Sequence, residues 1–183
     1  HGESDQNAKA AKANDSDGAM EVTGGNGNHV SKANLEGACL LHIEFQVPPT
    51  PETNGWQARG NSGVYVQGRY EIQILDSLGL ELRSGDCGGI YGKHIASVNA
   101  CKPAGEWQSY DIEFRSPRFG ADGKKTEHVR MTVWHNGLKI HDDVEVDGTT
   151  AAAMAGDEPG VGPILLQDHG HPVRYRNIWS LQR

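Results

Sequence analysis

Alternation of apolar and polar residues recurs along this chain and constrains its fold more than any other feature. In CLLHIEFQV (residues 39–47), every odd position from 41 onward is apolar, and the even positions hold His, Glu and Gln. Successive side chains of a β-strand point to opposite faces, so this period of two predicts a half-buried strand. The same alternation returns in WQSYDIEFRS (107–116), VRMTVWHNG (129–137) and LKIHDDVEV (138–146).

Turn residues separate these segments, and no segment carries a convincing helical pattern. The chain holds 24 glycines, which suit many tight turns. Asn136-Gly137 lies between two strand segments and predicts a hairpin, because both residues accept the positive φ angles of a tight turn. About ten short strands of this kind predict an all-β fold, a jelly-roll sandwich of two antiparallel sheets.

The polar N-terminal stretch sets the expected domain boundary. Residues 1–17 carry almost no large apolar side chain, so we expect an N-terminal arm or a degenerate edge strand there. One jelly-roll domain should then fill residues 18–183. The chain starts at His1 with neither an initiator Met nor a signal-like segment, which indicates a removed leader or a start inside a longer gene product.

Charge and hydropathy exclude two classes of partner. The chain has 17 basic and 24 acidic residues, interspersed, for a formal charge of -7. It therefore lacks the basic stripe that a nucleic-acid backbone requires. No apolar run approaches the roughly 18 residues of a membrane-spanning helix. We expect no nucleic-acid partner and no membrane span, and the sequence leaves the oligomeric state open.

The three cysteines allow two interpretations. Cys87 and Cys101 flank a Gly-rich loop, and a disulfide between them would contribute about 3 kcal/mol of loop-closure entropy. That bridge would favour an extracytoplasmic protein and would leave Cys39 unpaired. Alternatively, all three are small buried thiols.

Polar side chains on strand faces and in one loop are the candidates for a functional site. They are Glu44 on one strand, Glu71 and Gln73 on a second, Gln167 and His169 on a third, and Arg59 and Asn61 in the loop RGNSG. These residues could line one cleft, although a polar strand face is also what a solvated sheet looks like. In PILLQDHG, we expect Ile164 and Leu166 to face the core and Asp168 to point away and brace the turn.

Six ordered segments carry a resemblance to a known family. They are LHIEFQVP, RGNSGVYVQGRYEIQILDS, CGGIYGK, VNACKPAGEWQSYDIEFRSPRF, MTVWHNG and GPILLQDHGHPVRYRNIW. From about residue 18 to its C-terminus the chain resembles the secreted 3-keto-disaccharide hydrolase domain family. The resemblance implies a concanavalin A-like jelly roll with a carbohydrate cleft on its concave sheet, and an extracytoplasmic location, secreted or periplasmic.

The same resemblance implies a hydrolase or lyase that acts on glycosides oxidised at C3. A C3 ketone acidifies the C2 proton, so a base can remove it, the C1 aglycone leaves, and water then adds back. We assign His169 as the base and Glu71 or Glu44 as acid/base groups. Gln73, Gln167, Arg59, Asn61 and Tyr91 would bind the substrate. A divalent cation could sit among Glu44, Glu71 and His169.

Two other functions stay open at the level of sequence. A non-catalytic carbohydrate-binding module would stack sugars on aromatic side chains, and Trp56 and Tyr91 are candidates. Trp107 and Trp134 lie in strand segments, so we expect them in the core. A copper oxygenase would use His1 in a histidine brace, which requires a second His nearby in space.

Overall fold

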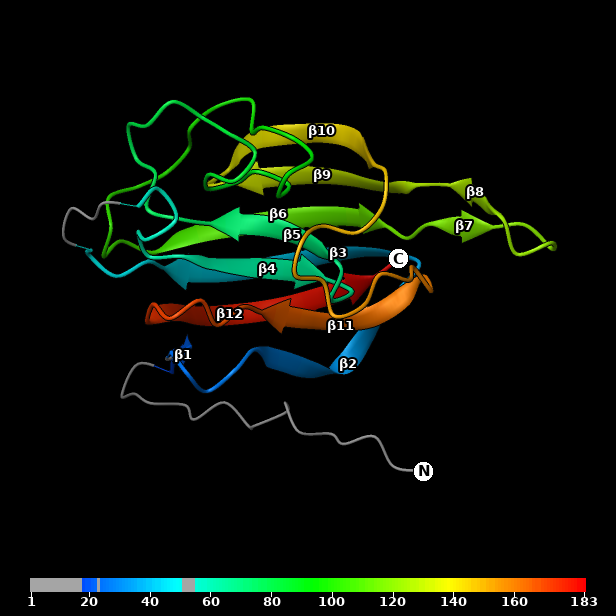
Figure 1. Cartoon of the computed structure of the whole chain (residues 1–183), viewed down its shortest axis with the longest axis horizontal. Helices are drawn as coiled ribbons and strands as arrows, with labels where there is room; N and C mark the ends of the chain where they lie inside the picture. The colour runs from blue at the N-terminus through cyan, green and yellow to red at the C-terminus, as the bar shows by residue number, and fades with distance from the viewer. Residues whose placement is uncertain (1–17, 23, 51–54) are drawn as a thin grey trace.

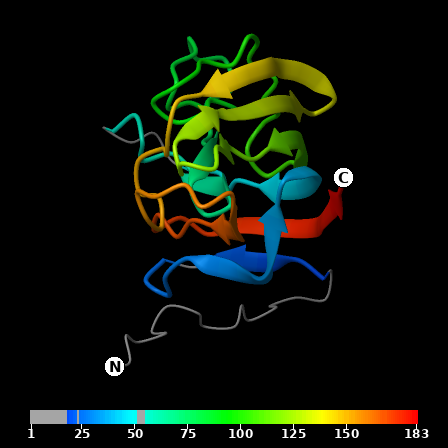
Figure 2. The ribbon, with the colours of Figure 1, turned by 90° about the vertical axis from the view of Figure 1, so that its right-hand side faces the viewer.

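The alternating segments fold into two antiparallel sheets that lie face to face (Figures 1 and 2). The computed structural model describes residues 18–22, 24–50 and 55–183. The larger sheet has the strand order β1 (Met20–Val22), β12 (Val173–Gln182), β3 (Ala38–Gln46), β6 (Gln108–Arg115), β9 (Val129–His135) and β10 (Leu138–Val146). The smaller sheet has the order β2 (His29–Glu36), β11 (Val161–Leu166), β4 (Ser62–Val66) and β5 (Tyr70–Ile74). The predicted all-β sandwich is confirmed.

The core lies between the sheets because the apolar side chains of each strand point inward. Ile43 and Phe45 of β3 and Ile72 and Ile74 of β5 are completely buried in one hydrophobic cluster. Burial of a side chain of this size contributes about 1.5–3 kcal/mol, so the alternation itself supplies the force that holds the sheets together. Within the described ranges, no helix is long and apolar enough to cross a membrane.

The Asn136-Gly137 hairpin forms as predicted between β9 and β10. Asn136 and Gly137 have φ angles of 51° and 80°, and Leu138 pairs with His135 across the turn. Glycine is needed here because a Cβ at such φ values is strained. The position of His135 beside Asn136 predicts a turn residue, but His135 is the buried last residue of β9.

Two expectations about local structure need correction, and one feature of the structure was not expected. The segment GGIYGK reads as a short strand in the sequence, but it forms only isolated bridges, from Ile90 to Ile72 and to His94. The ribbon of β7 (Arg118–Phe119) and β8 (Lys125–Glu127), which projects from one end in Figure 1, was not predicted. Trp107 and Trp134 were expected in the core. Both are half-buried and lie outside it, because their side chains point to the outer face of the larger sheet.

The outer face of the smaller sheet is covered by loops. The backbone amide of Gln73 donates to Gly89, and the amide of Gly88 donates back to Gln73, so this segment adds to the edge of β5. The segment 147–160 crosses in front of the same sheet in Figure 1 and lies on its side of the molecule in Figure 2. Side chains that face outward from β4 and β5 are therefore buried. The proposed arm at 1–17 and the copper ligand His1 lie outside the described residues.

Candidate active site

The register of β4 and β5 builds the floor of a polar pocket. Tyr65 pairs with Glu71 and Gly63 with Gln73, while the neighbouring Val64 and Ile72 face the core. Alternation thus turns Tyr65, Glu71 and Gln73 together toward the covering loops.

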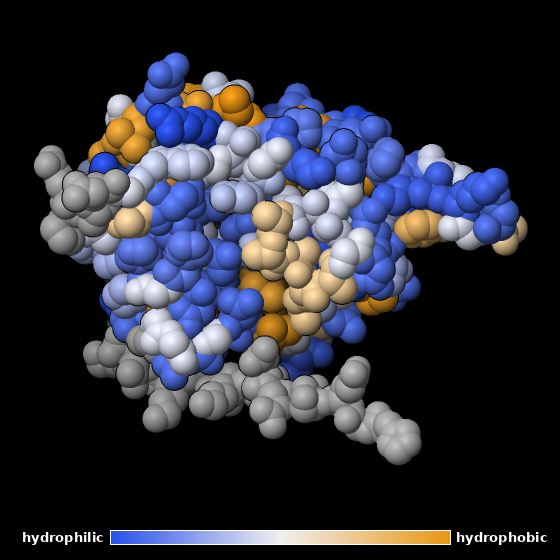
Figure 3. Space-filling view, viewed as in Figure 1, coloured by the Kyte–Doolittle hydropathy of each residue, from blue (hydrophilic) through white to orange (hydrophobic). Residues whose placement is uncertain are grey.

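This pocket has a volume of about 130 Å³, and eight of its ten lining residues carry a polar atom in the side chain. Its lining residues are Gln57, Asn61, Tyr65, Glu71, Gln73, Tyr91, Ala151, Ala152, Gln167 and His169. Six of the eight candidate residues from the sequence lie here: Asn61, Glu71, Gln73, Tyr91, Gln167 and His169. The face over the smaller sheet is mainly hydrophilic (Figure 3), as a surface that meets a polar ligand would be.

Glu71 is the most perturbed acid in the pocket. Its side chain is only 2% exposed, and burial raises the pKa of its carboxyl to about 7, against the opposing effect of a hydrogen bond from Tyr65. Gly63 makes room for it, since a Cβ at that position would lie 2.2 Å from Glu71 Oε1. A buried carboxyl with a pKa near neutrality can both donate and accept a proton in the same cycle.

The Tyr65 hydroxyl connects Glu71 to Gln167. It lies 2.7 Å from Glu71 Oε2 and 3.1 Å from the carbonyl oxygen of Ala151, and it accepts from Gln167 Nε2 at 3.2 Å. The single proton of this hydroxyl has two possible acceptors. When Glu71 is protonated, the hydroxyl can donate to the Ala151 carbonyl instead. Burial raises the pKa of Tyr65 far above its usual range, so the group stays a neutral hydroxyl.

A chain of side-chain amides fixes one wall. Gln73 Nε2 donates to Asn61 Oδ1 at 2.8 Å, and Asn61 Nδ2 donates to Gln57 Oε1 at 2.7 Å. Gln57 Nε2 in turn donates to the carbonyl of Gly85. These amides are held in one orientation by each other. In contrast, Gln167 Oε1 is buried without a hydrogen-bond partner among the described residues, so it can accept from a ligand.

His169 lies exposed at the edge of the pocket, directly after β11. Its ring stacks against His171 with centroids 6.4 Å apart and an interplanar angle of 9°. Asp168 turns away, as expected. Burial alone would raise its pKa, but the backbone amides of Gly170 and Gly27 donate to its carboxylate and hold the pKa below its usual range.

The structure separates Glu44 and Arg59 from the other candidates. Glu44 is on β3 of the larger sheet and faces outward between buried Ile43 and Phe45, so the sandwich core lies between it and Glu71. Its carboxylate pairs with Arg176 and Asn177. Arg59 donates from Nε to the carbonyl of Asp76 at 3.0 Å and does not line the pocket. The expectation that both share a cleft with His169 is wrong.

The position of Glu44 on the other sheet also bears on the divalent cation considered for Glu44, Glu71 and His169. Without Glu44, the pocket lining holds one carboxylate and one imidazole. Those two donors fall short of the three protein ligands typical of a catalytic metal site. The pocket residues therefore do not fit the proposed metal, and we derive no step through one.

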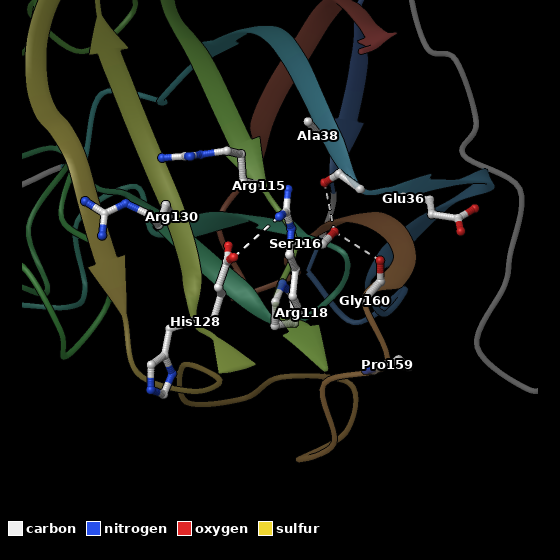
Figure 4. A pocket seen from close by; sticks show the side chains of 12 residues that line it. Glu36, Ala38, Arg115, Ser116, Arg118, His128, Arg130, Pro159 and Gly160 are labelled. Carbon is white, nitrogen blue, oxygen red and sulfur yellow. Dashed lines mark hydrogen bonds and ion pairs between the residues drawn. The ribbon is translucent and has the colours of Figure 1, made fainter. Parts of the chain in front are cut away.

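A wider hollow lies at the base of the β7–β8 ribbon (Figure 4). Its volume is about 310 Å³, and Arg115, Arg118 and Arg130 border it. These cations are already paired, Arg118 with Glu127 at 3.4 Å and the other two with Asp143. The hollow shares no residue with the Glu71 pocket.

Sequence reasoning missed Tyr65, Gln57 and the pair Ala151–Ala152. Tyr65 could have been predicted from the sequence. It alternates with Val64 and Val66, so its side chain points away from the core, and a short hairpin joins its strand to YEIQI. No local pattern marks Gln57 or the alanines, since they reach the pocket through loop conformation.

A jelly roll with an acid, a phenol, amides and an imidazole gathered over one sheet defines the class as a carbohydrate-active β-sandwich hydrolase or lyase. The chain belongs to the 3-keto-alpha-glucoside-1,2-lyase-like domain family, whose model matches residues 2–180. A crystal structure of a proposed glycosyl hydrolase from Parabacteroides distasonis is 36% identical, with a TM-score of 0.83 over 95% of this chain and 75% of that one.

A second proposed glycosyl hydrolase from Parabacteroides distasonis shares the fold at 22% identity. Its TM-score is 0.62 over 91% of this chain and 88% of that one. A comparison with curated proteins found no match.

Proposed function

We propose that this protein cleaves 3-keto-glycosides by elimination followed by hydration. In the first half, a base removes the C2 proton, the C1–O bond to the aglycone breaks, and a C1=C2 double bond forms in conjugation with the C3 ketone. In the second half, water adds its oxygen to C1 and C2 regains a proton. The products are the free aglycone and the 3-keto sugar, so atoms balance without an oxidant or reductant.

The observation that carries this proposal is the raised pKa of Glu71, about 7, in a pocket of hydroxyl and amide groups. The leaving oxygen needs a proton as the C1–O bond breaks, and the water that adds later needs to lose one. A carboxyl that is half protonated near neutral pH serves both needs. Tyr65 follows each change of charge by directing its proton to Glu71 or to Ala151.

His169 is proposed as the base for C2. It stands at the open edge of the pocket and takes the C2 proton in the elimination, then returns a proton to C2 in the hydration. Gln167 Oε1 accepts from a sugar hydroxyl, because this oxygen has no hydrogen-bond partner among the residues that the structure describes. Tyr91 borders the pocket from the segment that pairs with β5, where it contacts the face of the sugar.

The test is release of aglycone from a chromogenic 3-keto-glucoside by the purified chain. Glu71→Gln and His169→Ala should each lower kcat by about 10²–10⁴, the range of general acid–base catalysis. Glu44→Gln is the matched control, since it makes the same substitution on the opposite side of the sandwich and should leave kcat unchanged. No release by the wild type, with or without added divalent metal, would refute the proposal.

A non-catalytic carbohydrate-binding role has one observation in its favour. Trp56 is 39% exposed beside pocket residue Gln57, and the Arg83 guanidinium lies 5.1 Å from the centre of its ring. An exposed indole can stack on a pyranose. If Glu71→Gln and His169→Ala kept full glycan affinity and no substrate were ever turned over, this second function would be the correct one. The extracytoplasmic location implied by the family stays part of the proposal.

A further inference from the structure

A second group of reactive side chains lies outside the pocket. Cys87, Cys101 and His135 come from three separate segments, yet one sulfur or nitrogen of each lies within 4.8 Å of the other two. Cys87 and His135 are almost completely buried and Cys101 is half-buried. The disulfide considered for Cys87 and Cys101 is not formed, and both are free thiols that face each other.

The hydrogen bonds around His135 leave one ring nitrogen available as a ligand. Nε2 lies 3.0 Å from Gln108 Oε1, an oxygen that also accepts from the backbone amide of Lys102. Because this oxygen can only accept, Nε2 carries the ring proton and Nδ1 carries the lone pair.

Nδ1 of His135 is buried and has no hydrogen-bond partner within the described part of the chain. It faces the Cys87 segment, since a Cβ on Gly88 would lie 3.7 Å from it. A histidine whose second nitrogen is held by a carbonyl-type oxygen is the usual arrangement of a metal ligand. An unpartnered buried nitrogen beside two thiols is otherwise unexplained.

We propose that Cys87 Sγ, Cys101 Sγ and His135 Nδ1 together bind one zinc ion. Tetrahedral zinc bonds of about 2.3 Å to sulfur and 2.0 Å to nitrogen bring ligand atoms to roughly 3.4–3.8 Å apart, a contraction of about 1 Å from the observed limit. Binding releases the two thiol protons, and two thiolates then neutralise Zn²⁺. That neutrality matters because a net charge in this interior would be costly.

The ion would fix the wall of the Glu71 pocket without taking part in its chemistry. Tyr110 lies 3.1 Å from Cys87 Sγ through its hydroxyl, which donates to the carbonyl of Gln73 at 2.6 Å. Gly88, next to Cys87, donates to the same carbonyl. A metal bound to Cys87 therefore holds the segment that follows this cysteine and carries Tyr91.

The test uses the full chain, purified under reducing conditions and stripped of metal. Titration with Zn²⁺ against a chromophoric chelator should give one ion per chain. Titration with Co²⁺ should give the thiolate charge-transfer absorption of a tetrahedral site. Loss of an outer-sphere partner weakens metal binding by roughly 10- to 100-fold. Cys101→Ser removes a direct ligand, so it should weaken zinc binding by at least that much. Cys39→Ala, which removes a buried thiol elsewhere, should bind like the wild type.

Three outcomes would overturn the proposal: no stoichiometric zinc binding by the reduced wild type, a native Cys87–Cys101 disulfide found by mass spectrometry, or equal weakening in Cys39→Ala. Binding of copper(I) without zinc or cobalt would also contradict it. The wild-type titration needs no substitution, so the proposal stays testable even if Cys101→Ser fails to fold.

Discussion

Replacement of Glu71 by Gln should stabilise the protein in a pH-dependent way. The folded-state pKa of Glu71, about 7, lies above its ordinary value of 4.5. Folding therefore favours the protonated form, and the wild type loses stability as pH rises from the lower value through the higher one. The variant carries no charge at this position and does not lose that stability.

The size of the effect follows from the pKa change. Each pKa unit corresponds to about 1.4 kcal/mol, so the change from 4.5 to about 7 gives about 3 kcal/mol. The variant should match the wild type at acid pH and exceed it by about 3 kcal/mol once the pH is above the folded-state pKa. Gln keeps the shape of the side chain and can still accept from Tyr65.

Urea unfolding of both proteins at several pH values between about 5 and 9 measures this difference directly. Glu44→Gln serves as the control, because hydrogen bonds from Asn177 and Arg176 lower the pKa of Glu44, which changes the sign of the effect. A difference between Glu71→Gln and wild type that is constant with pH would refute the account of Glu71 as a buried, destabilising anion.

Three further predictions concern the floor and the edge of the same pocket. Gly63→Ala should destabilise the fold by about 1–3 kcal/mol in urea unfolding, because its Cβ would lie 2.2 Å from Glu71 Oε1; unchanged stability would mean that the carboxylate has room to move. Tyr65→Phe removes the hydrogen bond that lowers the pKa of Glu71, so the alkaline limb of the kcat profile should move to higher pH, and a shift to lower pH would reverse the assigned role. His169→Ala should lower kcat while His171→Ala, at the stacked neighbour outside the pocket lining, should change it little; equal losses would remove His169 from its proposed role.

The sequence determined which residues of a strand point together, but not which sheet each strand joins. Glu44 and Glu71 both have the outward parity on their strands, and pattern alone made them look like members of one cleft. The sandwich has two outer faces, and the strand order sends β3 to the larger sheet and β5 to the smaller one. That assignment depends on long-range pairing, such as β3 with β6 and β12, which local alternation does not encode.

The pocket walls illustrate the same limit at loops. Gln167 and His169 were predictable from the parity they share, although β11 ends at Leu166 and has a register shift between Pro163 and Leu165. Ala151 and Ala152 belong to a loop without periodicity, and the contact of Thr150 with the amide of Glu71 brings them over the sheet. The spacing of Cys87 and Cys101 allowed a close pair but did not require one, and the approach of His135 depended on the register of β9 against β6.

The most direct test of elimination followed by hydration is the fate of the C2 proton. Turnover of a 3-keto-glucoside in D₂O, followed by NMR at early times, should give a 3-keto sugar with deuterium at C2. The free 3-keto sugar, incubated alone under the same conditions, corrects for spontaneous exchange. Deuterium at C2 beyond that background is the result we predict. Release of aglycone with the original C2 proton retained would indicate direct displacement at C1 and contradict the account.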